Sequence, residues 1–186
     1  MIDKKMIQNE TIANILTRVT VRNFTDEPVS DRSLRLLLQA AMAAPSSMNL
    51  QPWHFIVIRD ESLKRILKDS LPYARMINRG CVGIVVCGDT SLYEHINRTD
   101  REDNTLYWVQ DCSAASENLL LAAHAIGLGA VWTGVWPLQS RVDRLRGLLD
   151  IPGHVVPLNM ILVGHPVSLP LPKEKWDEKK LHYDRF

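Results

Sequence analysis

The feature that most constrains the fold is a long helical pattern in the second half of the chain. Between residues 105 and 126, apolar side chains recur at steps of three and four. One row consists of Trp108, Cys112, Ala115, Leu119, Ala122 and Ile126, and a second row consists of Val109, Leu120 and Ala123. A helix that is apolar over so wide an arc has to be covered on more than one side. We therefore expect this helix to be central.

The segments around this helix alternate between strand and helix patterns. β-Branched or continuously apolar runs predict strands at 54–58, 81–87, 130–135 and 155–163. Helical spacing predicts helices at 6–16, between the N-cap Ser30 and Pro45, at 61–68 and at 138–149. No linker or repeat divides the 186 residues. We therefore expect one α+β domain, residues 1–186, with a central sheet covered by helices.

Composition and charge exclude several classes of protein. Lys and Arg number 22 against 21 Asp and Glu, a net charge of +1, so nothing points to a nucleic-acid or anionic membrane partner. No apolar stretch approaches the ~20 residues of a membrane-spanning helix. The N-terminal decapeptide MIDKKMIQNE is not followed by the apolar region of a secretory signal, so we expect a cytoplasmic protein.

The usual catalytic devices are missing from the sequence. It has no G-x-S-x-G elbow, no phosphate loop and no H-E-x-x-H helix, and its six histidines lack metal-ligand spacing, so no metal site is expected. His124 is interpreted as a hydrogen-bonded core residue. The thiols of Cys81, Cys87 and Cys112 are expected to be reduced and buried. The arginines of the 138–149 helix, Arg141, Arg144 and Arg146, are interpreted as a solvated face.

Two polar clusters remain as candidate binding residues. Arg18, Thr20 and Arg22 alternate with valines, so an extended segment would point all three to one side, which suits a phosphate monoester. Two surface arginines in a loop would give the same pattern. Residues 45–53, PSSMNLQPW, crowd hydroxyl, amide and backbone donors beside an indole, which suits a flat heteroaromatic ring. A plain turn between a helix and a strand is the alternative.

Long motifs connect these clusters to a known family. The chain carries R-x-T-x-R-x-F from Arg18, A-A-P-S-S-M-N-L-Q-P-W-H-F-I-V from residue 43, Q-D-x-x-A-A-x-E-N-L-L-L-A-A-H-A-I-G-L-G from residue 110 and V-G-H-P from residue 163. In order and spacing this resembles the FMN-dependent nitroreductase family, from Arg18 to about Lys175. The resemblance implies a central mixed or antiparallel sheet and an interlocked homodimer with FMN at the interface.

The resemblance also implies which residues hold FMN. One subunit would bind the phosphate through its arginine segment and its tail. Residues 132–134 of the same subunit would lie along the flavin, where a backbone N–H donates to N5. The partner would supply the serine-rich loop, and the second apolar row of the long helix would face the partner. The implied cofactor-binding residues are Arg18, Thr20, Arg22, Pro45, Ser46, Ser47, Met48, Asn49, Gln51, Trp132, Thr133, Gly134, Lys173 and Lys175.

The implied activity is hydride transfer from NADH or NADPH to flavin N5 and onward, in a ping-pong cycle, to an electron-poor small molecule such as a nitroaromatic or quinone. No catalytic side chain is expected, because the cofactor carries the chemistry. A flavin-binding module without turnover, or a specialised dehalogenase or dehydrogenase on the same fold, is the alternative. The family's common R-R-S-x-R opening has Val19 and Thr20 here, so one phosphate-facing charge is lost. Residues 90–104 are the one segment available as a lid.

Overall fold

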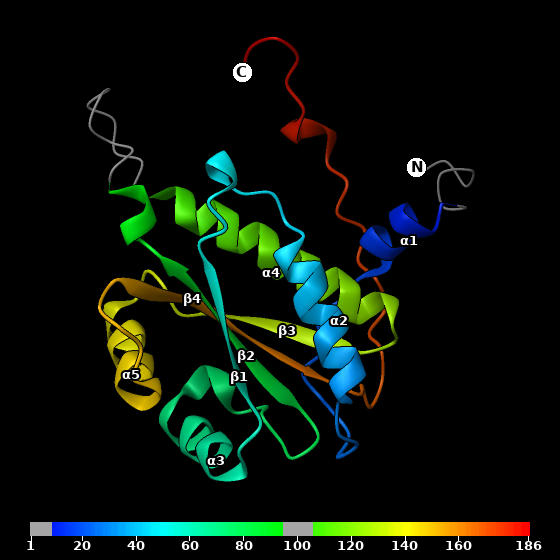
Figure 1. Cartoon of the computed structure of the whole chain (residues 1–186). Helices are drawn as coiled ribbons and strands as arrows, with labels where there is room; N and C mark the ends of the chain where they lie inside the picture. Colours follow the sequence, from blue (N-terminus) through cyan, green and yellow to red (C-terminus); the bar gives the residue numbers. More distant parts are fainter. Residues whose placement is uncertain (1–8, 95–105) are drawn as a thin grey trace.

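The computed structural model describes residues 9–94 and 106–186, and its centre is a four-stranded sheet (Figure 1). The strands are β1 (Trp53–Ile58), β2 (Val82–Asp89), β3 (Gly129–Gly134) and β4 (Val155–Gly164), in the order β1-β2-β4-β3. Every neighbouring pair is antiparallel. The central strands β2 and β4 are buried almost throughout, which the continuous apolar run 81–87 predicts for β2. The α+β class and all four predicted strands are confirmed.

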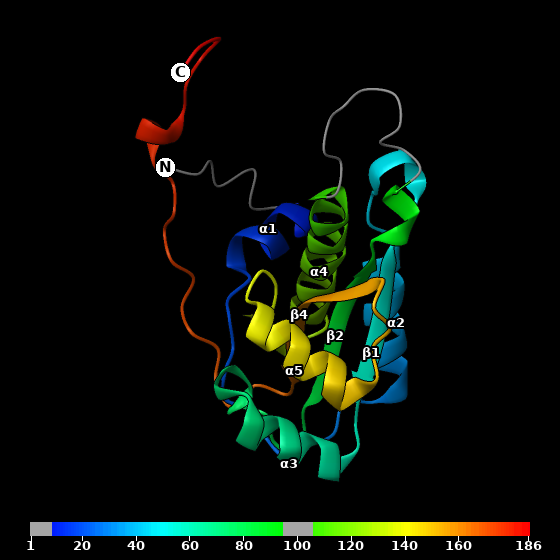
Figure 2. The same cartoon turned by 90° about the vertical axis from the view of Figure 1, so that its left-hand side faces the viewer.

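Helices cover both faces of the sheet (Figure 2). On one face lie α4 (Tyr107–Ala125) and α2 (Asp31–Met42), whose buried side chains form one core with that side of the strands. On the other face lie α3 (Glu61–Ser70) and α5 (Gln139–Leu149), with a second core beneath them. The short α1 (Glu10–Thr17) lies on α4, where Asn14 Nδ2 donates to the Leu121 carbonyl at 3.0 Å.

Most residues of the two apolar rows of α4 pack inside the chain, although Ile126, at the C-cap, is 38% exposed. Leu119 of the first row is fully buried, and so is Ala123 of the second row. Leu120 is 5% exposed and Val109 is partly buried. The expectation that the second row faces a partner is therefore wrong for Leu120 and Ala123, which the chain's own core already covers. The wide apolar arc reflects a helix enclosed by its own chain.

Caps and turns set the helix ends where the sequence predicts them. Ser30 Oγ accepts from the Ser33 amide at 3.1 Å at the start of α2, and α2 ends at Met42, before Pro45. Gly127 follows α4 with a φ of +78°, the left-handed conformation that glycine adopts without strain. The predicted helix 6–16 is observed from Glu10 onward, and its first residues lie outside the described part of the chain. Most of the predicted excursion 90–104 lies outside it too.

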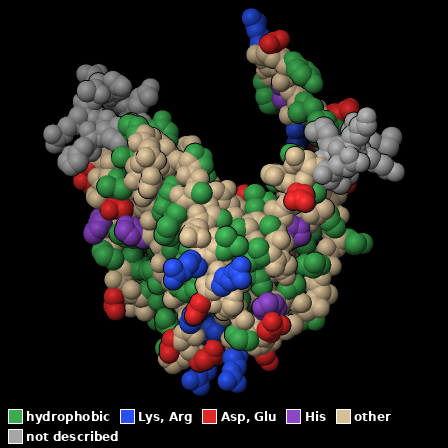
Figure 3. Space-filling model, turned by 45° about the vertical axis from the view of Figure 1, so that its right-hand side comes forward, with side chains coloured by type: hydrophobic (Ala, Val, Ile, Leu, Met, Phe, Trp, Pro, Cys, Tyr) green, Lys and Arg blue, Asp and Glu red, His purple; other side chains and the backbone are tan. Residues whose placement is uncertain are grey.

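After β4 the chain runs as an extended tail, as its prolines predict, with one short turn, η7 (Glu178–Lys180). Every residue from Val167 to Phe186 is exposed, and Leu171, Trp176 and Tyr183 expose 87%, 60% and 84% of their surface. Figure 3 shows the tail projecting from the body with hydrophobic side chains along it. Within residues 9–94 and 106–186, no helix has the length and apolar character to cross a membrane.

Candidate functional site

The arginine segment lies against the outer edge of β3. The Val21 amide donates to the Ala130 carbonyl at 2.9 Å, and Thr20 forms a parallel bridge with Ala130. Val21 is buried, whereas Arg22 is exposed and Thr20 is partly exposed, as expected for alternating side chains on an extended segment. A Cβ on Gly129 would lie 2.7 Å from the Val21 Cβ, so glycine lets the two backbones approach here.

The two arginines of this segment differ in their surroundings. Arg18 Nε lies 3.4 Å from the Glu117 carboxylate on α4, and the Arg18 side chain is only 18% exposed. Arg22 has no ion-pair partner among the described residues. Close by, Thr17 Oγ1 and His124 Nε2 are 2.9 Å apart. Burial lowers the pKa of His124, and the positive charge of Arg18 lowers it further by a smaller amount. The predicted hydrogen bond of His124 is therefore confirmed, but its predicted place in the core is wrong, because the side chain is only partly buried.

The remainder of this β3 edge presents backbone groups without a neighbouring strand. Because the Ala130 carbonyl points away from β4, strand alternation also directs the N–H groups of Trp132 and Gly134 away from β4. A Cβ on Gly134 would meet nothing within 4 Å, so there is open space beside the strand end. Thr133 faces inward, and its Oγ1 donates to the Met160 carbonyl at 2.5 Å. Trp132 is 36% exposed at this edge.

Arg141, which the sequence analysis assigned to a solvated face, lies instead at this edge of β3. Its Nη1 donates to the Gly134 carbonyl at 2.7 Å, and its guanidinium lies 4.5 Å from the ring centre of Tyr73. Burial raises the pKa of Tyr73, and Arg141 partly offsets this effect. Arg146 donates to the carbonyls of Gly153 and Val155. The predicted solvated face is therefore wrong for Arg141 and Arg146, because both guanidiniums bind carbonyls at the ends of neighbouring strands.

The serine-rich loop forms a tight structure between α2 and β1. It contains one turn of 3-10 helix, η2 (Ser47–Asn49), and Ser46 Oγ accepts from the Gln51 amide at 3.0 Å. Met48, Asn49 and Gln51 have φ values of 50°, 55° and 50°. For residues other than glycine this left-handed conformation is uncommon. Met48 is 60% exposed, and Pro45 is exposed as well, so the loop presents these side chains to the outside.

A buried carboxyl group of α4 holds this loop. Asp111 is 6% exposed, and its Oδ1 accepts from the Ser47 amide at 3.0 Å. Its Oδ2 accepts from the hydroxyl of Tyr93, in η4 (Ser91–Tyr93), at 2.5 Å. Burial and the hydrogen bond to Asp111 raise the pKa of Tyr93. Sequence reasoning missed Asp111, although a carboxyl group within an otherwise apolar helix face was a usable signal.

The sequence-predicted site residues therefore fall into three groups. Thr20 and Val21 lie beside Ala130 of β3, Arg18 and Arg22 flank them in the same segment, and residues 132–134 follow Ala130 along the strand. The serine-rich loop meets α4 at Asp111, six residues before Glu117, which corresponds to roughly 9 Å along the helix axis. The tail leaves the body beside Arg22, where the Val167 amide donates to the Asn23 carbonyl at 3.1 Å. Lys173 and Lys175 follow on the exposed part of the tail.

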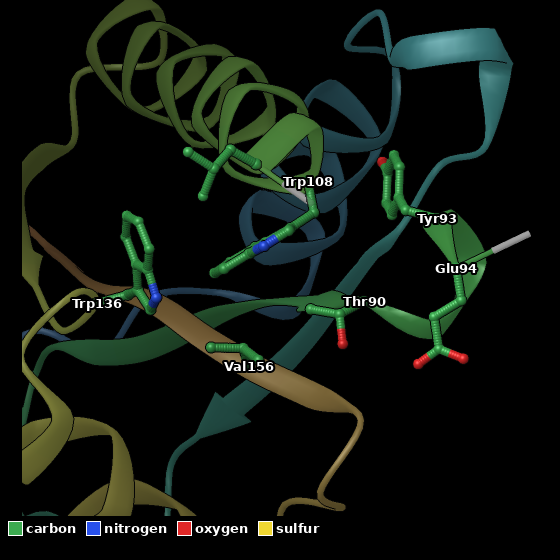
Figure 4. A pocket seen from close by; sticks show the side chains of 7 residues that line it. Thr90, Tyr93, Glu94, Trp108, Trp136 and Val156 are labelled. Carbon is green, nitrogen blue, oxygen red and sulfur yellow. The ribbon is translucent and has the colours of Figure 1, made fainter. Parts of the chain in front are cut away.

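A cavity that the sequence did not predict lies near the start of α4 (Figure 4). Its volume is about 400 Å³, and the Trp108 and Trp136 rings meet edge to face with centres 5.5 Å apart. Its lining residues are Thr90, Tyr93, Glu94, Leu106, Trp108, Trp136 and Val156.

All three cysteines are free and buried, as predicted. In the part of the chain that the structure describes, no three metal-binding side chains cluster.

Comparison with known proteins gives a consistent result. The model of the nitroreductase family matches residues 15–74 and 69–165. A Methanothermobacter thermautotrophicus protein, provisionally named an NADH dehydrogenase/NAD(P)H nitroreductase, is 40% identical over 185 residues, all of this chain and 92% of the relative. The FMN reductase (NADPH) of Bacillus subtilis is 27% identical over 95% of this chain and 74% of its own. A provisionally titled nitroreductase from Desulfovibrio desulfuricans, solved with FMN, superimposes with a TM-score of 0.78 at 33% identity, covering 96% of this chain and 98% of its own.

Proposed function

The chain belongs to the nitroreductase family, and from this premise we propose that it is an FMN-dependent oxidoreductase. It takes hydride from NADH or NADPH and reduces an electron-poor small molecule such as a nitroaromatic or a quinone. The names of its relatives support the cofactor and the nicotinamide substrate, since they include an NADPH-dependent FMN reductase and a structure solved with FMN. The acceptor and the ping-pong order are parts of the proposal.

The observation that carries this proposal is the outer edge of β3. It offers outward N–H donors at Trp132 and Gly134, with open space at Gly134, and the same strand pairs at Ala130 with the segment that carries two guanidiniums and a hydroxyl. Guanidiniums and hydroxyls are the donors that bind a phosphate monoester, and an unpaired strand edge is a donor row for a flat ring with a polar edge. The donor set therefore fits FMN, with its phosphate at Arg18, Thr20 and Arg22.

The second part of the proposal is a homodimer with one FMN in each of two shared sites. In one chain the serine-rich loop and the arginine segment meet α4 at different stretches, and in the proposal a second copy places its own loop beside these arginines. Exposed apolar side chains on α1 and the tail, such as Ile15, Leu171 and Trp176, support an extensive contact between copies. Lys173 and Lys175 then supply positive charge to the phosphate, and Pro45, Ser46, Met48, Asn49 and Gln51 supply loop contacts.

The protein's own part in the reaction is binding and orientation. When bound, FMN supplies the hydride chemistry at its N5. The Gly134 N–H would hold the ring edge, and the Arg141 guanidinium, which donates to the Gly134 carbonyl, would place a positive charge near it. Such a charge favours the build-up of negative charge on the ring. No side chain has to accept or donate the hydride, which explains why the sequence lacks a catalytic triad.

The test is an anaerobic titration of the FMN-loaded protein. We expect NADH or NADPH to bleach the visible absorbance of the flavin, and a nitroaromatic or quinone to restore it. A coloured protein that neither nicotinamide bleaches would refute the oxidoreductase and favour a flavin-binding module without turnover. A protein that is bleached but is not reoxidised by nitroaromatics or quinones would favour a specialised dehalogenase or dehydrogenase.

A further inference from the structure

We propose that Asp111 is a positioning residue that holds the serine-rich loop, Pro45 to Gln51, in the conformation that binds the cofactor, and that the Tyr93 hydroxyl holds Asp111 in turn. The expected effect on FMN binding rests on the proposed function, since the loop is one of the proposed FMN contacts. The positioning itself is a property of the chain without FMN.

The loop needs an external tie because its backbone is strained. Met48, Asn49 and Gln51 all have left-handed φ values, and residues other than glycine keep such conformations only where the surrounding structure imposes them. The hydrogen bonds within the loop, from the Asn49 amide to Ser46 and from the Leu50 amide to Ser47, close it on itself. They define its shape but do not fix its position on the protein.

Asp111 provides the tie to the rest of the chain. Its Oδ1 accepts from the Ser47 amide at 3.0 Å, and this is the one hydrogen bond among the described residues that joins the Ser46–Gln51 backbone to another element. Asp111 is only 6% exposed, and it comes from α4, the helix with the most buried residues. A carboxyl oxygen in so rigid a place fixes the position of the amide that it accepts from.

Tyr93 completes the arrangement from the opposite side. Its hydroxyl donates to Oδ2 at 2.5 Å, so both carboxyl oxygens have a donor and the rotation of the side chain is restricted. Figure 4 shows the Tyr93 ring beside the aromatic cavity with its hydroxyl directed away from the cavity. Tyr93 is 1% exposed, and burying a hydroxyl is costly unless it has a partner. The chain therefore retains a buried polar pair at the point where the loop meets α4.

The test compares Asp111→Ala with Asn118→Ala in the protein without FMN. Asn118 is a matched control, because its side chain also leaves α4 to bind a backbone group, the Ala40 carbonyl at 3.1 Å, but does not touch the loop. We expect hydrogen exchange in residues 45–51 to become about tenfold faster or more in Asp111→Ala, corresponding to loss of a bond worth roughly 1.4 kcal/mol. The control should match wild type in these residues.

A double variant keeps the test decisive if Asp111→Ala does not fold. Tyr93→Phe with Asp111→Leu replaces both members of the buried pair by apolar groups of similar shape, which preserves packing while removing the acceptor of Ser47. It should show the same faster exchange and at least a tenfold weaker FMN affinity. Asp111→Asn retains an amide oxygen for Ser47 and should lie closer to wild type than Asp111→Ala. Loop exchange unchanged in both the alanine and the double variant would overturn the positioning role. Failure of wild-type protein to bind FMN would instead refute the proposed function, and the exchange result would stand independently.

Discussion

Replacing Arg22 with alanine removes one guanidinium from the proposed phosphate site while disturbing the fold little. Arg22 is exposed and lies outside both cores, so the substitution should leave thermal stability close to that of wild type. Arg18 is a poorer choice, because removing it would also leave Glu117 without its partner. The effect expected of Arg22→Ala is therefore confined to ligand binding.

The magnitude follows from the type of contact. A charge-assisted hydrogen bond to phosphate contributes roughly 1.5–3 kcal/mol, which corresponds to an FMN affinity roughly 10- to 150-fold weaker. Because Arg22 is exposed, the lower end of this range is expected, and raising the salt should shrink the difference, since the Debye length is only about 8 Å at 0.15 M. Riboflavin lacks the phosphate, so its affinity should hardly change.

The assay is fluorescence titration of FMN and of riboflavin with wild type, Arg22→Ala and Arg144→Ala. Arg144 is an exposed arginine on α5 and controls for the loss of one positive charge. The reasoning is refuted if Arg22→Ala weakens riboflavin as much as FMN, or if Arg144→Ala weakens FMN to the same extent.

Three further predictions concern the fold. Leu119 is fully buried in α4, so Leu119→Ala should cost about 2–5 kcal/mol of unfolding free energy in a denaturant titration; a smaller loss would contradict the central role of α4. Gly147 lies within α5 with nothing within 4 Å of a new Cβ, so Gly147→Ala should raise the unfolding free energy by about 0.5–1 kcal/mol. Gly127 has a φ of +78°, so Gly127→Ala should lower it. Changes of the same sign in the two variants, measured in the same titrations, would contradict the assigned backbone. Burial raises the pKa of Cys87 from 9.0 to about 12, so its contribution to stability is present at neutral pH and is lost as the pH rises from about 9 towards 12. A thiol reagent at pH 8 should label the native protein very slowly and all three cysteines after unfolding; fast native labelling would show that the thiols are accessible.

Local and periodic signals in the sequence predicted most of the fold. The run 81–87 was apolar enough to require burial on both faces, and the structure places it, with the strand predicted at 155–163, as the two inner strands. Ser30 and Gly127 marked helix ends through capping chemistry that depends on neighbouring residues alone. These features are readable because their physical cause lies within a few residues of the chain.

Features that depend on contacts between distant residues were not readable. The apolar row containing Leu120 and Ala123 shows that a surface is covered, but not whether the cover is the same chain or a partner. Arg141 was interpreted as exposed because its target, the Gly134 carbonyl, is fixed by the end of a strand rather than by spacing within α5. Asp111 finds its two donors 64 and 18 residues away, so no local pattern shows that they converge.

The central claim is that each FMN is held by the arginine segment of one chain and the serine-rich loop of another. Mixed dimers of an Arg22→Ala chain and a Ser46→Ala/Asn49→Ala chain, each first shown to weaken FMN as a homodimer, test it by FMN titration. If the sites are shared, one site of the mixed dimer carries both lesions and the other carries none, so half of the sites should regain wild-type affinity. Uniformly weakened sites with no wild-type fraction would show that both elements act within one chain and would contradict the account.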